Sequence, residues 1–292
     1  MEETMPELAQ AATEVSQSQT TGRERFFVRF TREQRYMHAV LFTTFLGLAG
    51  TGLPLRFSDS IWARGLASAV GGFGAILFFH KLCALVLSIA FLVHVKEIVT
   101  RGIYRREKGI FWGATSMVAN WKDVKDLLAH MRWFLGMGPK PQFERYAYWE
   151  KFDYWAVFWG MIVIGFSGYA MWFAPFFARF LPGWALNAAL VIHSEEGLLA
   201  ILFIFSIHFV NTHLRPDSFP MDMVIFTGVE SEKEFEHKRP QEYARMAREG
   251  KLEGRLGEAP AAWFVRLARA IGFTAIFIGV TLLILTLTAY FD

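Results

Sequence analysis

Two hydrophobic stretches of the chain each carry a histidine near both ends. One runs from His80 to His94 and the other from His193 to His208, which are steps of 14 and 15 residues. In an α-helix these steps span about 21 and 22 Å and rotate by net angles of about −40° and 60°. The imidazoles of each helix should therefore point to roughly one side, at opposite depths of a hydrocarbon layer about 30 Å thick.

Histidine is a good axial ligand for heme iron, and polar groups at membrane depth tend to mark functional sites. A single histidine in an apolar helix is usually a core residue with one hydrogen bond. Two stretches with matching histidine spacing instead predict two iron porphyrins, one above the other. The only cysteine is Cys83, and the chain has no Cys-x-x-Cys-His sequence. The expected hemes are therefore b-type, and any iron–sulfur carrier has to belong to another subunit.

The composition predicts an all-α membrane protein. The 292 residues are 53% hydrophobic and 16% aromatic, with a net charge of +3, and soluble domains are less apolar. The hydropathy pattern predicts membrane helices at 36–53, 75–99, 153–173, 187–213 and 268–290. The expected fold is a four-helix heme-binding bundle plus a fifth, C-terminal transmembrane helix. The N-terminus lacks the pattern of a signal peptide, so no cleavage is expected.

The polar segments suggest domain limits. The predicted units are a disordered tail at 1–22, a di-heme membrane domain at 23–215, a polar, solvated segment at 216–262 and the fifth helix within 263–292. The membrane domain includes a polar connection, 100–152, in which 121–135 has the pattern of an amphipathic helix on the membrane surface. His130 and His237 lie in these polar parts. His130 is expected to be a surface residue, and His237 is expected to have no functional role.

Basic residues predict the orientation in the membrane. Lys and Arg are frequent in the tail and in the connections 100–152 and 214–262, whereas the loops 55–74 and 174–187 hold only three arginines. Because basic loops stay in the cytoplasm, the N-terminus should be cytoplasmic and the C-terminus outside. His80 and His193 should then lie toward the outer face of the cell (inner) membrane. The cytoplasmic side should hold His38, His94, His208 and His213.

The chain resembles the membrane cytochrome b (gamma) subunits of respiratory formate dehydrogenases and nickel–iron hydrogenases over roughly residues 30–215. The resemblance rests on the sequence from Phe30 to His38, on Gly50-Thr-Gly-Leu-Pro54, on His80 and on His193-x-x-x-Gly197. The stretch from His208 to Asp222 is closest to a branch of quinone-linked cytochromes b found beside multiheme cytochromes c.

The resemblance implies a set of heme ligands. His80 with His193 would hold the outer heme, and His38 with His208 would hold the inner one. His94 has no counterpart in the formate dehydrogenase subunit. The matching histidine spacing of the two hydrophobic stretches instead gives the pairing of His94 with His208 as an alternative. His213 lies about 140° around an α-helix from His208, so it is expected to serve a quinone, or a third heme with His94, rather than the same iron.

The resemblance also implies a function. The expected chain transfers electrons between quinone or menaquinone and an iron–sulfur or multiheme cytochrome c subunit, through two or three b hemes, with no dehydrogenase site of its own. The quinone candidates are Glu150, Asp153 and His213, although an ordinary charged helix start predicts the same acidic residues. A heme-poor membrane anchor or assembly subunit and a transmembrane metal reductase are the alternatives. Membrane lipid is an expected partner and nucleic acid is not. The direction of electron flow stays open.

Overall fold

The computed structural model describes residues 24–290, and the tail that was predicted to be disordered lies outside them. Five helices are long and apolar enough to cross a membrane, which confirms the predicted number. They are α2 (Arg32–Arg56), α4 (Phe73–Val99) with the π-helical turn η1 (Thr100–Tyr104), α6 (Tyr148–Trp172), α8 (Gly183–Phe203) with two π-helical turns, η2 (Ile204–His208) and η3 (Val210–Leu214), and α12 (Ala262–Thr288).

Each of these helices begins two to six residues before the position that hydropathy predicts. Polar capping residues explain the difference for α2, where the Thr31 hydroxyl accepts a hydrogen bond from the Gln34 amide and the Gln34 side chain accepts one from the Thr31 amide. Such a capping box starts a helix on polar residues that a hydropathy average does not count. At the other end α2 continues past Pro54 to Arg56.

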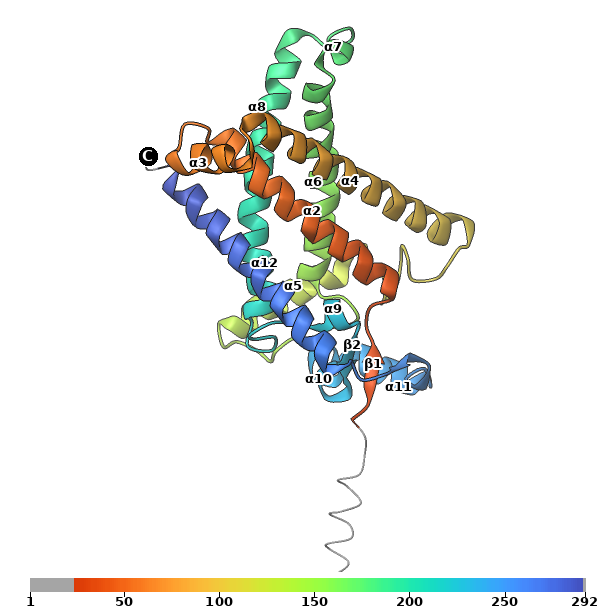
Figure 1. Cartoon of the computed structure of the whole chain (residues 1–292). Helices are drawn as coiled ribbons and strands as arrows, with labels where there is room; N and C mark the ends of the chain where they lie inside the picture. Colours follow the sequence, from red (N-terminus) through yellow and green to blue (C-terminus); the bar gives the residue numbers. More distant parts are fainter. Residues whose placement is uncertain (1–23, 291–292) are drawn as a thin grey trace, which may run out of the picture.

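The membrane helices pack as two pairs with the fifth helix alongside. Helix α2 packs along α4 and α6 along α8, while α12 contacts α2 (Figure 1). One apolar cluster joins the first, fourth and fifth of these helices, and its buried members are Ala49, Leu53, Leu198, Ile201, Phe205 and Leu282. The connections that were expected to be loops contain α3 (Ile61–Val70) and α7 (Ala174–Phe177).

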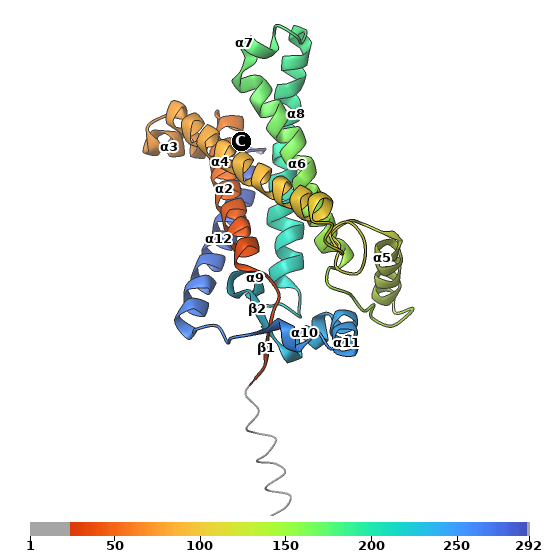
Figure 2. The same cartoon turned by 90° about the vertical axis from the view of Figure 1, so that its right-hand side faces the viewer.

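A small folded module lies at the end of the bundle where the described chain begins (Figure 2). Its central strand β1 (Phe26–Val28) pairs antiparallel with β2 (Val229–Ser231) and β3 (Leu256–Gly257). The module also contains α9 (Val224–Thr227), α10 (Glu232–Lys238), α11 (Pro240–Arg248) and the short η4 (Glu253–Arg255). Phe27, Phe235 and Met246 form its apolar core. The expectation of a solvated segment at 216–262 is therefore wrong for this part, because its charged side chains pair with one another.

The predicted amphipathic helix is present as α5 (Trp121–Phe134). Its apolar residues are exposed, and Trp121 is 70% accessible. The expectation that His130 is a surface residue is wrong, because it is 6% accessible. Its ring stacks on Phe134, and its Nδ1 lies 3.1 Å from the Tyr148 hydroxyl.

Candidate functional site

A single large cavity between the helices brings the predicted site residues together. Its volume is about 2350 Å³, well above the 300–1,000 Å³ or so of an ordinary ligand pocket. The predicted residues that line it are His38, His80, His94, His193, His208, His213, Glu150 and Asp153. The cavity therefore has room for more than one large ligand along the row of histidines.

His80 and His193 face each other across one end of the cavity. Their ring centroids are 6.1 Å apart and their planes are inclined by 76°. An imidazole nitrogen binds a metal at about 2 Å, and the ring centre lies about 1 Å further out, so two axial ligands of one metal have centroids about 6 Å apart. The observed centroid distance is close to this value.

Hydrogen bonds hold both of these rings by the same nitrogen. The His193 Nδ1 lies 2.9 Å from the carbonyl oxygen of Ile164, which can only accept, so this nitrogen carries the proton. The His80 Nδ1 lies 3.0 Å from the Thr51 hydroxyl oxygen, and that hydroxyl donates to the carbonyl oxygen of Gly47. His80 therefore also carries its proton on Nδ1. In both residues Nε2 is therefore unprotonated and Nδ1 is held by a hydrogen bond. An imidazole in this form can bind a metal through Nε2.

Two glycines leave room for these rings. A Cβ on Gly168 of α6 would lie 2.9 Å from the Cε1 of His193, and a Cβ on Gly52 of α2 would lie 3.2 Å from the Cε1 of His80. Any side chain at either position would push the imidazole away from its observed place. Gly52 belongs to the Gly-Thr-Gly sequence noted above, but the contact itself was not predicted from the sequence.

The second group of histidines lies toward the module. His208 is held by Asp153, whose Oδ2 is 2.9 Å from the His208 Nδ1. This contact again leaves the Nε2 of the histidine free. His38 of α2 lines the same cavity as His208 and His213, and its ring packs against Phe42.

The end of the fourth membrane helix is not α-helical. His208 closes the π-helical turn η2, and His213 lies in the next one, η3. In a π-helix the hydrogen bonds join residues five apart, so each residue turns by less than the roughly 100° of an α-helix. The expected angle of about 140° between His208 and His213 assumed α-helical geometry, and the π-helical turns make it smaller. Both side chains line the cavity.

His94 has different neighbours. Its Nε2 lies 3.0 Å from the hydroxyl oxygen of Tyr154, and its ring packs against Tyr154 and Phe158 of α6. The Nε2 of His94 is thus engaged by a phenol, whereas in His80, His193 and His208 the hydrogen bond is made by Nδ1. His94 lines the same cavity, but its polar contact is with an aromatic residue of α6.

The three quinone candidates differ in how their polar atoms are used. Glu150 accepts from the Ala147 amide at 2.7 Å and pairs with Arg29 at 3.4 Å, so it caps α6 and anchors an arginine. In contrast, the Oδ1 of Asp153 and the Nδ1 of His213 are buried with no hydrogen-bond partner in residues 24–290. These two atoms are available to a bound polar ligand. At the opposite end of the cavity Glu195 pairs with Arg56 at 2.9 Å.

No protein-family model matches the chain. No curated protein matches it either.

Proposed function

We propose that the chain is a membrane cytochrome b that carries electrons between quinone and a partner redox subunit. The observation that supports this most is the pair of His80 and His193, with a 6.1 Å ring separation and both Nδ1 atoms anchored. Bound b hemes would supply one-electron redox chemistry at this pair and at the His208 end of the cavity. The chain's own residues would hold the rings, fix their tautomers and exclude water from the cavity.

For the second heme, the contacts support His208 together with His38. His38 lines the cavity with His208 and His213, whereas the Nε2 of His94 contacts the Tyr154 hydroxyl. Asp153 would orient His208 and make it a stronger ligand, as carboxylates do for metal-bound histidines. Two hemes are therefore proposed. His94 would line the cavity without binding iron.

The quinone would bind near the His208 end. Reduction or oxidation of a quinone requires groups that can exchange a proton at hydrogen-bond distance. The unpartnered Nδ1 of His213 and Oδ1 of Asp153 are such groups. Since the basic segments around β1, α5 and α10 all gather at this end of the bundle (Figure 1), the positive-inside rule would place it in the cytoplasm.

Heme content tests this function. In the purified wild-type chain, a pyridine hemochrome assay should give two b hemes per chain. His80→Ala and His193→Ala should each remove the same single heme, because the two rings share one iron. His237→Ala is the matched control, since its ring is at the surface and its side chain is 64% accessible. A wild-type chain without heme would reject the cytochrome function and leave the membrane-anchor alternative.

The inner ligand can be tested in the same way. His38→Ala should remove the heme at His208, and His94→Ala should leave two hemes with low-spin spectra. Loss of a heme in the His94 variant with both hemes kept in the His38 variant would assign His94 as the ligand. Loss of a different heme in each variant would show that the chain holds three.

A further inference from the structure

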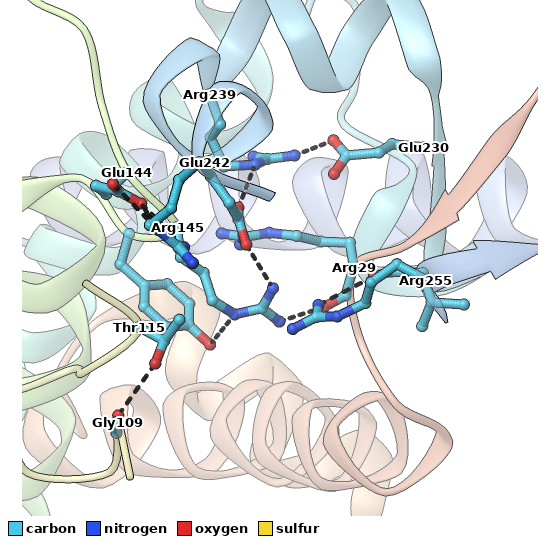
Figure 3. Close-up of polar contacts among 12 residues, drawn as sticks. Arg29, Gly109, Thr115, Glu144, Arg145, Glu230, Arg239, Glu242 and Arg255 are labelled. Atoms are coloured by element: carbon cyan, nitrogen blue, oxygen red, sulfur yellow. Dashed lines mark hydrogen bonds and ion pairs between the residues drawn. The ribbon is translucent and has the colours of Figure 1, made fainter. Parts of the chain in front are cut away.

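A buried cluster of charged residues lies between the module and the cavity (Figure 3). We call it the basic cluster, and its arginines are Arg29, Arg145, Arg239 and Arg255. They come from the N-terminal arm, the connection before α6 and the module, which are far apart in the sequence. All four line the cavity that contains the histidines.

The carboxylates of the cluster are shared among several arginines. Glu242 is 1% accessible. It accepts from the Arg145 guanidinium at 3.0 Å and lies 3.7 Å from Arg29 and 3.6 Å from Arg239. Glu230 pairs with Arg239, and Glu150 with Arg29. Three carboxylates thus face four guanidinium groups in the described chain, which leaves one positive charge without a partner.

The hydrogen bonds and ion pairs of each arginine show which guanidinium lacks a carboxylate partner. Within residues 24–290, the Arg255 guanidinium hydrogen-bonds only the carbonyl oxygen of Val28, at 3.4 Å, and pairs with no carboxylate. The Nη1 of Arg29 and the Nε of Arg239 are buried without a hydrogen-bond partner in the same part of the chain. The Arg29 side chain is 2% accessible and that of Arg239 is 11%. Both atoms lie within 3.7 Å of the Oε2 of Glu242, which is itself buried without a hydrogen-bond partner, so Arg255 is the guanidinium that no described carboxylate neutralises.

Two of the four arginines have lowered pKa values, and burial is the main cause in both. Burial and the neighbouring charge of Arg29 lower the pKa of Arg239 to about 9. Burial, with Arg145 and Arg29 adding to it, also lowers the pKa of Arg255. Both groups stay protonated at neutral pH, and an added anion would relieve their repulsion.

The cluster is close to the histidines of the second group. Glu150, which pairs with Arg29, lies three residues before Asp153, which holds His208. Residues three apart lie on the same face of a helix, roughly one turn or 5 Å apart along its axis. A ligand that binds at His208 and extends a few ångströms toward the module would reach the guanidinium groups.

We propose that Arg29, Arg239 and Arg255 form a binding site for the carboxylates on the edge of the porphyrin held at His208. This inference rests on the proposed cytochrome function. A b heme carries two propionate carboxylates on one edge, and guanidinium groups bind carboxylates through paired, charge-assisted hydrogen bonds. Arg255 would be the main contact of the site, because Arg29, Arg145 and Arg239 already pair with Glu242, whereas Arg255 pairs with no carboxylate in residues 24–290. A lipid phosphate is a poorer occupant, because these side chains line the interior cavity and two of them are almost fully buried.

The test compares heme with heme dimethyl ester, in which both propionates are masked. The full chain carrying His80→Ala, so that only the His208 site is scored, is prepared without heme and titrated with each porphyrin. The parent should bind heme at least about tenfold more tightly than the ester, which corresponds to one charged hydrogen bond. Arg255→Gln should weaken heme binding by a similar factor and leave ester binding unchanged, which also shows that the variant is folded. Arg248→Gln, at an exposed position of α11, is the matched control and should bind both like the parent.

Three results would overturn the inference while leaving the cytochrome function intact. One is equal affinity of the parent for heme and ester. Another is an equal loss of both porphyrins in Arg255→Gln, which would indicate a structural role. The third is thermal stabilisation of the parent by inorganic phosphate that is lost in Arg255→Gln, while ester binding is the same in both chains. This result would indicate a site for a free anion. Failure of the parent to bind either porphyrin would instead reject the proposed function itself.

Discussion

At the scale of single residues, the site depends on which nitrogen of each histidine carries the proton. Ile164 holds the Nδ1 of His193 and Asp153 lies at the Nδ1 of His208, so in both rings Nε2 is directed away from the anchor. The two anchors differ in charge: a carboxylate makes the imidazole a stronger electron donor than a carbonyl does. The two ends of the cavity therefore differ chemically even though each presents histidine.

Asp153→Asn tests this difference. The variant keeps the shape of the side chain but removes the charge, so we expect about tenfold weaker porphyrin binding at His208. Titration of the His80→Ala chain, followed by the low-spin absorption bands, measures it. Asp126→Asn is the control, because Asp126 pairs with Lys122 on α5, away from the cavity. Unchanged affinity in Asp153→Asn would mean that the carboxylate does not orient the ligand.

At the scale of helices, glycines decide how closely α6 approaches His193. We expect Gly168→Ala to displace the ring, because the new Cβ would lie 2.9 Å from it, and to reduce heme at the His80 and His193 site. Gly50→Ala in α2 meets nothing within 4 Å and does not line the cavity, so it should keep both hemes. It should also be more stable by up to about 1 kcal/mol, since alanine favours helix over glycine. Pyridine hemochrome content and thermal unfolding of both variants check this, and equal heme content would refute the steric role.

The helices and their histidines could largely be predicted, because apolar length and the spacing of His80, His94, His193 and His208 are properties of the sequence. The relation of His208 to His213 could not, since a π-helical turn changes the angle per residue without a sequence signal that hydropathy detects. The anchor of His193 is a backbone carbonyl, which every residue possesses. The role of Asp153 was also hidden, because a carboxylate at a helix start is ordinary.

At the scale of the whole molecule, the basic cluster joins the N-terminal arm to the module and to the start of α6. In the sequence, Arg29 precedes the first membrane helix, Arg145 lies in the polar connection 100–152, and Arg239 and Arg255 lie in the polar segment 216–262. A pattern of charges does not show which of them will meet. Strand β1 has three residues, too few for a periodic signal. The burial of Glu242 arises from contacts with Arg29 and Arg145, at sequence separations that no local pattern can encode.

Glu242→Gln should destabilise the chain by about 3–5 kcal/mol, because it leaves buried guanidinium groups without their shared carboxylate. Chemical unfolding in detergent at neutral pH measures the loss. Glu249→Gln, which removes an exposed carboxylate that pairs with Lys251, should leave the unfolding midpoint unchanged. A small effect in Glu242→Gln would mean that the cluster does not hold the module together.

The same residue predicts a pH dependence. Burial alone would raise the pKa of Glu242, but Arg29, Arg145 and Arg239 together outweigh it and lower the pKa below its usual value of 4.5. A carboxyl with a lowered folded-state pKa stabilises fully above its unfolded-state value and loses this stabilisation as the pH falls through the folded-state value. The wild-type chain should therefore lose stability below about pH 4.5 more steeply than Glu242→Gln, as acid unfolding curves of the two would show. Parallel curves would contradict the prediction.

The central place of β1 in the sheet also sets an order of events during biosynthesis. β1 is synthesised first, but Arg25, just before it, pairs with Glu232, 207 residues later. At about 5–20 residues per second, ribosomal synthesis separates the two by roughly 10–40 s. The ribosome has by then completed the first four membrane helices, and the six histidines of these helices that line the cavity are present before β2 arrives to close the module. A bulky cofactor could therefore enter the cavity from the side that the module later covers. Formation of the sheet would then hinder its release.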